Sequence, residues 1–313
     1  MKIAAITITY NDDYKFNEWF QHYSEYKDEL YLHIIIDNNS NYQYLKKVQE
    51  TFTESHIIQR NSNGGCTGAY NDGIKYALSV SEVDAIMLIG NDVRLKKGAS
   101  TILYDRLFKD SKMGMISPIL LAKDSLIAED FGCNISKALI MEPHGCGLNL
   151  QSVNESINYC EALTGGMNLS KREFYETVGL QDDNLFMYSD EVDMGLRAKK
   201  CGFTMAAISE AVSWHQHINK DTNSNRRDPY TKYLAGRNKV YVAKKHFGVF
   251  RVIYVFLFYV FGSMYKILIN LIKGNFYQIK EYFWLIFGAV MGLLGNMKPN
   301  RFSVPKEDLQ LQK

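Results

Sequence analysis

The first 121 residues alternate short β-rich runs with helix-like segments, and this alternation restricts the possible folds more than any other feature of the chain. It predicts a mostly parallel sheet covered by helices. In such sheets, ligands bind beyond the carboxyl ends of the strands. The β-rich runs are Ile3 to Thr9, Tyr31 to Ile36, His56 to Gln59 and Ala85 to Ile89.

Polar or glycine residues follow each of these runs. They are Tyr10-Asn11-Asp12, Asp37-Asn38-Asn39-Ser40, Arg60-Asn61 and Gly90-Asn91-Asp92. Any one of them is an ordinary turn or helix cap, but four in succession indicate a binding site. After the third run, the glycine-rich segment from Asn63 to Gly73 leads into a predicted helix, whose amino end favours a phosphate. This segment is neither a dinucleotide fingerprint nor a P-loop.

Three carboxylates gather at Asp190, Glu191 and Asp193. With Ser189 as the cap, the pattern predicts an amphipathic helix up to Lys200, with Arg197 at the i,i+4 spacing from Asp193. A cluster of this kind binds a cation or accepts a proton. The alternative is helix capping combined with a surface ion pair.

Together these segments resemble the inverting nucleotide-sugar glycosyltransferases of family 2, over residues 1 to 247. The resemblance implies an α/β GT-A fold, which is Rossmann-like: a mostly parallel sheet flanked by helices. It also implies that the loops hold a nucleotide-sugar donor. Gly165-Gly166 is similar to the family's acceptor-side glycine segment. The segment from Tyr233 to Asn238 is similar to a Tyr/Arg-Asn helix that many bacterial members have. The implied donor-binding residues are Thr9, Tyr10, Asn11, Asp37, Asn39, Arg60, Gly64, Gly65, Asn71, Asn91, Asp92, Gly165, Gly166 and Arg237. For Arg237, a surface or packing role stays open.

The resemblance also implies a divalent cation, Mn²⁺ or Mg²⁺. Gly90 stands where the family's Asp-any-Asp motif has its first aspartate, which leaves Asp92 as the acidic ligand. A carboxylate, phosphate oxygens and water can bind such an ion. The second ligand is His215, with His217 as the alternative, and imidazole favours Mn²⁺. A strand-end histidine with only local hydrogen bonds is the competing interpretation.

Transfer of a sugar with inversion needs one base, which takes a proton from the acceptor hydroxyl. The leaving diphosphate needs no acid, because a cation stabilises its charge. We predict Glu191 as the base, with Asp190 as the alternative, and Asp193 as a residue that orients the site or pairs with Arg197.

The carboxyl-terminal part of the chain is different in character. Val252 to Tyr265 and Tyr282 to Met297 are uncharged and mostly apolar, but each is shorter than the roughly 20 residues of a spanning helix. The flanking basic residues are Arg251, Lys266, Lys273, Lys280, Lys298 and Arg301. This pattern favours a monotopic attachment to an anionic membrane surface. A helical hairpin packed on the catalytic domain, or a homo-oligomer interface, is the alternative.

We therefore expect a GT-A domain over 1–247, with a nucleotide-binding half over 1–121 and an acceptor and catalytic half over 122–247. Apolar helices over 248–300 and a polar tail over 301–313 complete the predicted organisation. Asn219 to Asp228 is the predicted mobile loop that closes over the substrate. The net charge of +2 carries no nucleic-acid signature. Five widely spaced cysteines and the absence of a signal peptide favour the cytoplasm.

The predicted function is transfer of one sugar, with inversion, from dTDP-rhamnose or a UDP-hexose to a lipid-linked glycan. Such a reaction serves bacterial surface polysaccharide assembly, as in a capsule or cell wall, at the inner face of the cell membrane. The alternatives are a catalytically inactive nucleotide-sugar or carbohydrate-binding scaffold with the same fold, and a sugar-nucleotide pyrophosphorylase.

Overall fold

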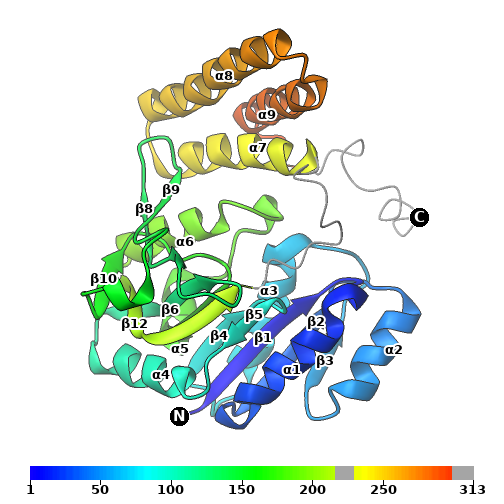
Figure 1. Ribbon diagram of the computed structural model, residues 1–313, viewed down its shortest axis with the longest axis vertical. Helices are drawn as coiled ribbons and strands as arrows, with labels where there is room; N and C mark the ends of the chain where they lie inside the picture. The colour runs from blue at the N-terminus through cyan, green and yellow to red at the C-terminus, as the bar shows by residue number, and fades with distance from the viewer. Residues whose placement is uncertain (216–228, 298–313) are drawn as a thin grey trace. The chain divides into compact units, whose positions relative to one another are not determined.

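A computed structural model of the chain describes residues 1–215 and 229–297 (Figure 1). The chain divides into two compact units. Unit 1 comprises Met1–Asn134, Met141–Gln181 and Met194–Lys220, and unit 2 comprises Ile135–Ile140, Asp182–Asp193 and Asp221–Lys313. His217 and the segment Asn219 to Asp228 lie outside the described residues, as does the polar tail. The predicted domain boundaries stay predictions.

The main sheet of unit 1 begins with four parallel strands in the order β3-β2-β1-β4. Three of the four predicted runs match the observed strands, and the second is shifted by one residue, because Asp37 still pairs with Thr9 and Gln59. These strands are β1 (Ile3–Thr9), β2 (Leu32–Asp37), β3 (His56–Gln59) and β4 (Ala85–Ile89).

The sheet continues from β4 through β11, β6 and β12 to β10, with β11 antiparallel to both of its neighbours. Strand β5 pairs with β12, β7 pairs with β6, and β8 and β9 form a separate two-stranded sheet. Their bounds are β5 (Val93–Leu95), β6 (Met113–Ala122), β7 (Ala128–Asp130), β8 (Cys133–Ile135), β9 (Met141–Pro143), β10 (Ile157–Cys160), β11 (Met167–Lys171) and β12 (Thr204–His215).

Both faces of the main sheet are buried under helices. Along β1, Ile3 and Ala5 belong to the core on one face, and Ala4 and Ile6 to the core on the other. The first core is closed by α1 (Phe16–Tyr26), α2 (Tyr42–Thr51) and α4 (Ala99–Lys109), and the second by α3 (Gly65–Ser79), α5 (Arg172–Val178) and the later part of α6 (Asp190–Lys200). A strand buried on both faces has an apolar run without alternation, as β1 and β4 have. The predicted mostly parallel sheet flanked by helices is confirmed.

Unit 2 contains three long helices, α7 (Pro229–His246), α8 (Val249–Ile272) and α9 (Phe276–Leu294). One element length differs from the expectation: α8 has 24 residues and is long and apolar enough to cross a membrane. The expected run was shorter because it ended at Lys266, whereas the helix continues through this lysine to Ile272. Short 3-10 turns complete the described chain, at Asp13–Lys15, Lys27–Glu29, Leu150–Ser152 and Asp183–Leu185.

Candidate functional site

In unit 1, the residues after β1 and β4 form one polar network. The Thr9 hydroxyl contacts the Tyr44 hydroxyl, and the Asn91 amide donates to Asp12 Oδ2 at 2.8 Å. Asp12 Oδ2 also accepts from the Tyr10 backbone N–H at 3.1 Å. Burial raises the pKa of Asp12, although the charge of Lys15 and the side-chain hydrogen bonds of Asn91 and Thr9 act against the shift. The first and fourth polar strand ends therefore meet, as the parallel sheet requires.

Asp37 ends β2 and is completely buried. Its Oδ2 accepts from the Ser40 backbone N–H at 3.1 Å, whereas its Oδ1 has no hydrogen-bond partner among the described residues. Burial raises the pKa of this carboxyl. A buried oxygen without a partner is costly, so Oδ1 is suited to accept a hydrogen bond from a ligand.

The neighbouring residues shape the turns around Asp37. Asn11 and Asn39 have left-handed backbones, with φ of 49° and 71°. The Asn11 backbone N–H donates to Ser40 Oγ at 3.0 Å, and its side-chain oxygen accepts from the Asn41 backbone N–H at 2.9 Å. Asparagine tolerates this conformation better than other non-glycine residues, which explains its repeated use here.

Asn38 connects this turn to the glycine segment, although it was not among the predicted donor-binding residues. Its amide donates to Asn63 Oδ1 at 2.9 Å and to the Gly65 carbonyl at 3.1 Å, and its Oδ1 accepts from the Gly64 N–H at 3.0 Å. In the sequence, the one sign of this role is that Asn38 belongs to the polar run Asp37-Asn38-Asn39-Ser40 after β2.

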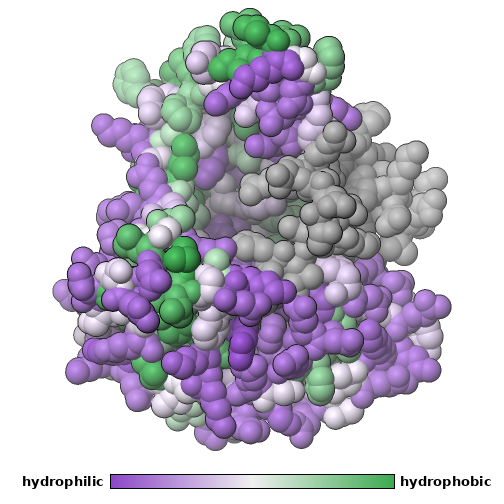
Figure 2. All heavy atoms as spheres, in the orientation of Figure 1, coloured by the Kyte–Doolittle hydropathy of each residue, from purple (hydrophilic) through white to green (hydrophobic). Residues whose placement is uncertain are grey.

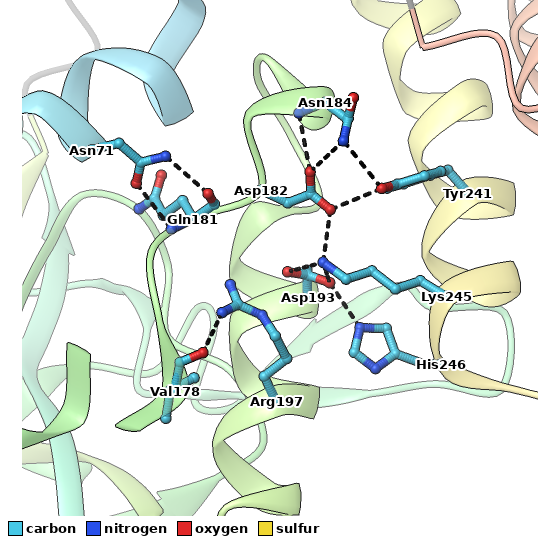
Figure 3. Close-up of polar contacts among 10 residues, drawn as sticks. All are labelled: Asn71, Val178, Gln181, Asp182, Asn184, Asp193, Arg197, Tyr241, Lys245 and His246. Carbon is cyan, nitrogen blue, oxygen red and sulfur yellow. Dashed lines mark hydrogen bonds and ion pairs between the residues drawn. The ribbon is translucent and has the colours of Figure 1, made fainter. Parts of the chain in front are cut away.

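Arg60 and Asn71 hold the helix that follows the glycines. The Arg60 guanidinium pairs with Asp72 and donates to the Gly68 carbonyl. A Cβ atom on Gly64 would lie 2.5 Å from Arg60 Nη2, so the glycine lets the guanidinium approach. Asn71 exchanges hydrogen bonds of 2.8 and 2.9 Å with the Gln181 backbone (Figure 3). Both residues thus have structural partners at the predicted donor site.

Asp92 lies at the centre of a second charged group in unit 1. Its Oδ1 is 3.7 Å from His215 Nε2, and its Oδ2 is 3.7 Å from Lys15 Nζ. His215 Nδ1 is in turn 3.7 Å from Glu129 Oε2. Burial opposes ionisation of Asp92, but His215 and Lys15 outweigh it, so its pKa lies far below the usual range. Lys15 and Glu129 were not predicted, because neither lies in a recognisable motif.

Gly90 has a physical role in this group. A Cβ atom at this position would lie 2.8 Å from Asp92 Oδ1, and the Gly90 N–H donates to the Gly166 carbonyl at 2.9 Å. The glycine therefore leaves room for the Asp92 carboxylate and places Gly166 beside the motif, while Gly165 is exposed. Among the described residues, no group of three or more His, Cys, Asp or Glu side chains is arranged to hold a metal ion.

The acidic cluster belongs to unit 2, at the start of α6. Burial, followed by the charge of Glu191, raises the pKa of Asp190 well above its usual value. Lys239 provides a nearby positive charge: burial lowers its pKa to about 8, although Glu191 acts in the opposite direction. A carboxyl that is buried beside a second carboxyl favours its protonated form.

Asp193 is completely buried and has two basic partners from α7 (Figure 3). Lys245 Nζ lies 2.9 Å from Asp193 Oδ1, and His246 Nε2 lies 2.7 Å from the same oxygen. Lys245 also contacts Asp182 Oδ2 at 2.7 Å, which accepts a further bond from the Tyr241 hydroxyl at 2.9 Å. Arg197, the predicted partner of Asp193, donates to the Val178 carbonyl at 2.7 Å. Asp193 is thus a buried counter-ion of α7.

Two expectations near this cluster need correction. Ser189 does not cap α6 with its side chain: its Oγ has no hydrogen-bond partner among the described residues, and its φ is 66°. A capping serine has an extended backbone instead. Arg237 is completely buried, and it donates to the carbonyls of Asn184 and Leu185 at 3.0 Å each and of Met297 at 2.7 Å. This geometry favours the packing role, so we remove Arg237 from the donor-binding set.

Comparison with known proteins gives the class of the chain. No family model matches it. It is 20% identical over 216 residues to the low-salt glycan biosynthesis hexosyltransferase Agl10 of Haloferax volcanii, covering 69% of this chain and 68% of that protein. It is 23% identical over 251 residues to the dTDP-rhamnosyl transferase RfbF of Shigella flexneri, covering 78% and 80%. The N-acetylglucosaminyl-diphospho-decaprenol L-rhamnosyltransferase of Mycobacterium tuberculosis is 24% identical over 184 residues, covering 54% and 58%. The chain is a glycosyltransferase.

Solved structures agree with the fold of this glycosyltransferase. The mannosyltransferase PcManGT from Pyrobaculum calidifontis, in complex with GDP-Man and Mn²⁺, matches with a TM-score of 0.55 at 12% identity, over 94% of this chain and 87% of that chain. GalNAc-T7, with UDP, GalNAc and Mn²⁺, matches with a TM-score of 0.57 at 13% identity, over 78% of this chain and 48% of that chain. The predicted GT-A fold is confirmed.

Proposed function

We propose that this glycosyltransferase moves one sugar, with inversion, from dTDP-rhamnose or a UDP-hexose to a lipid-linked glycan during bacterial surface polysaccharide assembly. The observation that carries the donor assignment is the buried Asp37 carboxyl, whose Oδ1 has no partner among the described residues. Uracil and thymine present the same hydrogen-bonding edge, so one acceptor oxygen serves both. The relative named as a dTDP-rhamnosyl transferase supports this donor class.

The Asp92 group fits a divalent cation with two protein ligands. The Asp92 Oδ1 and His215 Nε2 atoms of this group are 3.7 Å apart. This is close to the roughly 3.0–3.5 Å between two neighbouring ligand atoms that each lie about 2.1 Å from one metal ion. Diphosphate oxygens and water complete such a shell in other proteins. A bound Mn²⁺ or Mg²⁺ would stabilise the charge that develops on the leaving diphosphate. The two structural neighbours with Mn²⁺ support this part of the proposal.

In the proposed reaction, Glu191 takes the proton of the acceptor hydroxyl as that oxygen attacks the anomeric carbon from the face opposite the nucleotide. The bond from the anomeric carbon to the diphosphate breaks, and the nucleoside diphosphate leaves with the bonding electrons. Asp190, whose raised pKa favours its protonated form, stays neutral beside Glu191 during this step. Asp193 orients the helix that carries them.

The α8–α9 hairpin is the proposed contact with the inner face of the cell membrane. Its most exposed apolar side chains include Phe250, Ile272, Phe276 and Leu294, at 87%, 82%, 74% and 71%. Figure 2 shows hydrophobic side chains gathered over the α8 end of the molecule. Exposed patches of this kind mark membrane or protein contacts. Flotation with anionic liposomes tests the proposal, and a second copy of the chain bound there instead would appear as a salt-stable oligomer without lipid.

A donor-binding panel tests the proposed function. Purified protein is titrated with dTDP- and UDP-sugars in Mn²⁺, Mg²⁺ or EDTA, and heat stabilisation and released nucleoside diphosphate are measured. We expect a metal-dependent response to one donor, its loss in Asp37→Asn, and a normal response in Asp28→Asn, which changes an exposed carboxylate. Binding without release would show that the reaction needs its acceptor, whereas no binding to any donor would favour the inactive scaffold.

A further inference from the structure

The turn directly before Asp190 has an unusual backbone. Phe186, Tyr188 and Ser189 all have positive φ, of 63°, 70° and 66°. None is a glycine, and a non-glycine residue in such a sparsely populated backbone region costs about 1–3 kcal/mol. A turn with this strain persists only when its surroundings hold it in place.

Asn238 and Arg237 of α7 hold this turn. The Asn238 amide donates to the carbonyls of Leu185 at 2.9 Å and of Met187 and Tyr188 at 2.8 Å each. Arg237 adds the bonds to the carbonyls of Asn184 and Leu185, and its Nε donates to Asn238 Oδ1 at 2.9 Å. Both side chains are completely buried, so these bonds do not compete with water.

The same helix also holds both ends of the segment Asp182–Asp193. Tyr241 and Lys245 bind Asp182 at one end, and Lys245 and His246 bind Asp193 at the other (Figure 3). The segment with the two candidate bases is therefore attached to α7 at both ends and at the turn between them, and it belongs to unit 2 with that helix.

Helix α9 in turn fixes α7 through glycines. A Cβ atom on Gly292 would lie 2.2 Å from the Arg237 carbonyl oxygen, and one on Gly288 would lie 2.0 Å from the Tyr233 carbonyl oxygen. From the other side, a Cβ atom on Gly236 would lie 2.2 Å from the Leu285 carbonyl oxygen. The two helices thus meet at backbone distance, and the contact includes Arg237 itself.

We propose that Asn238 and Arg237 are positioning residues for the catalytic carboxylates, and that the glycine face of α9 sets their place. The apolar carboxyl-terminal helices are then part of the catalytic assembly, in addition to any membrane contact. This inference rests on the proposed function, since it takes Glu191 or Asp190 as the base.

The test uses the full chain and the donor found in the binding panel, with release of UDP or dTDP by slow hydrolysis as the readout. Asn238→Asp keeps the size of the side chain but removes both amide donors. We expect its kcat to fall at least tenfold, with KM for the donor and Kd for the nucleoside diphosphate within twofold of wild type. Lys244→Ala is the matched control. Lys244 also lies on α7 and donates to a backbone carbonyl, but that carbonyl belongs to Leu293 in α9 rather than to the catalytic segment.

Gly292→Ala tests the contribution of α9, and we expect the same loss of kcat with normal nucleotide binding. If it does not fold, Arg237→Lys replaces it, because a lysine cannot bond all of these carbonyls together. An Asn238→Asp rate within twofold of wild type, or a parallel loss of nucleotide binding and kcat, overturns the positioning role. The rates of Glu191→Gln and Asp190→Asn are measured in the same assay. If both keep the wild-type rate, the assignment of the base is wrong. A slow Glu191→Gln together with a normal Asn238→Asp overturns the positioning role alone.

Discussion

Asp193→Asn removes the buried charge that joins the start of α6 to the end of α7. The charge-assisted contacts of the carboxylate include those to Lys245 at 2.9 Å and to His246 at 2.7 Å. Hydrogen bonds of charged groups contribute about 1.5–3 kcal/mol each, and a neutral amide recovers about 1 kcal/mol. Lys245 keeps Asp182 at 2.7 Å, so the substitution leaves no unpaired lysine. The free energy of unfolding should therefore fall by about 3 kcal/mol.

Thermal and urea unfolding measure this loss. At about 2–4 °C per kcal/mol, the midpoint should fall by roughly 6–12 °C. Asp105→Asn, at an exposed carboxylate of α4, is the control and should change the stability by less than about 0.5 kcal/mol. Nucleoside diphosphate binding, which we assign to unit 1, should be unchanged. A stability loss below about 1 kcal/mol, or a fall in kcat as large as that of Glu191→Gln at normal stability, would refute the interpretation of Asp193 as a counter-ion.

Two further predictions concern unit 1. Burial lowers the pKa of His33 to about 3, so the unfolded chain binds one more proton below about pH 6.5, and stability should fall by about 1.4 kcal/mol per pH unit on acidification. His33→Gln should remove this slope from urea unfolding between pH 6 and pH 4, and parallel curves for the two proteins would contradict the shift. Gly90→Asp restores the family's first aspartate, but its Cβ atom would lie 2.8 Å from Asp92 Oδ1. We expect calorimetry to show weaker Mn²⁺-dependent nucleotide binding, and tighter binding would show that the Asp92 group lacks only a second acid.

The sheet was predictable from the sequence because its strands are buried on both faces. Continuous apolar runs such as Ile3 to Thr9 and Ala85 to Ile89 leave little choice of structure, and the polar residues after them mark the carboxyl edge. The meeting of Asn91 with Asp12 follows from parallel topology alone. These parts of the candidate donor site depend on local pattern and strand order.

The surroundings of the acids were not predictable in the same way. Helical spacing indicated Arg197 as a partner of Asp193, and that pairing stays a prediction. The spacing gave no sign of Lys245 and His246, which contact Asp193 from more than fifty residues further along the chain. Tertiary pairing of this kind leaves no periodic signal. The positive-φ turn before Asp190 also has no such signal, because Phe186, Tyr188 and Ser189 do not favour a positive φ. The buried Asn238, far along the chain, bonds the carbonyls of this turn.

The most direct test of the central claim is the transfer rate of Glu191→Gln and Asp190→Asn with the donor found in the binding panel and a lipid-linked glycan acceptor. A general base contributes about 10²–10⁴-fold, so loss of the base should slow transfer by at least 10²-fold while nucleotide binding stays normal. We predict this result for Glu191→Gln. If both variants transferred sugar at near-normal rates, the assigned base would be wrong.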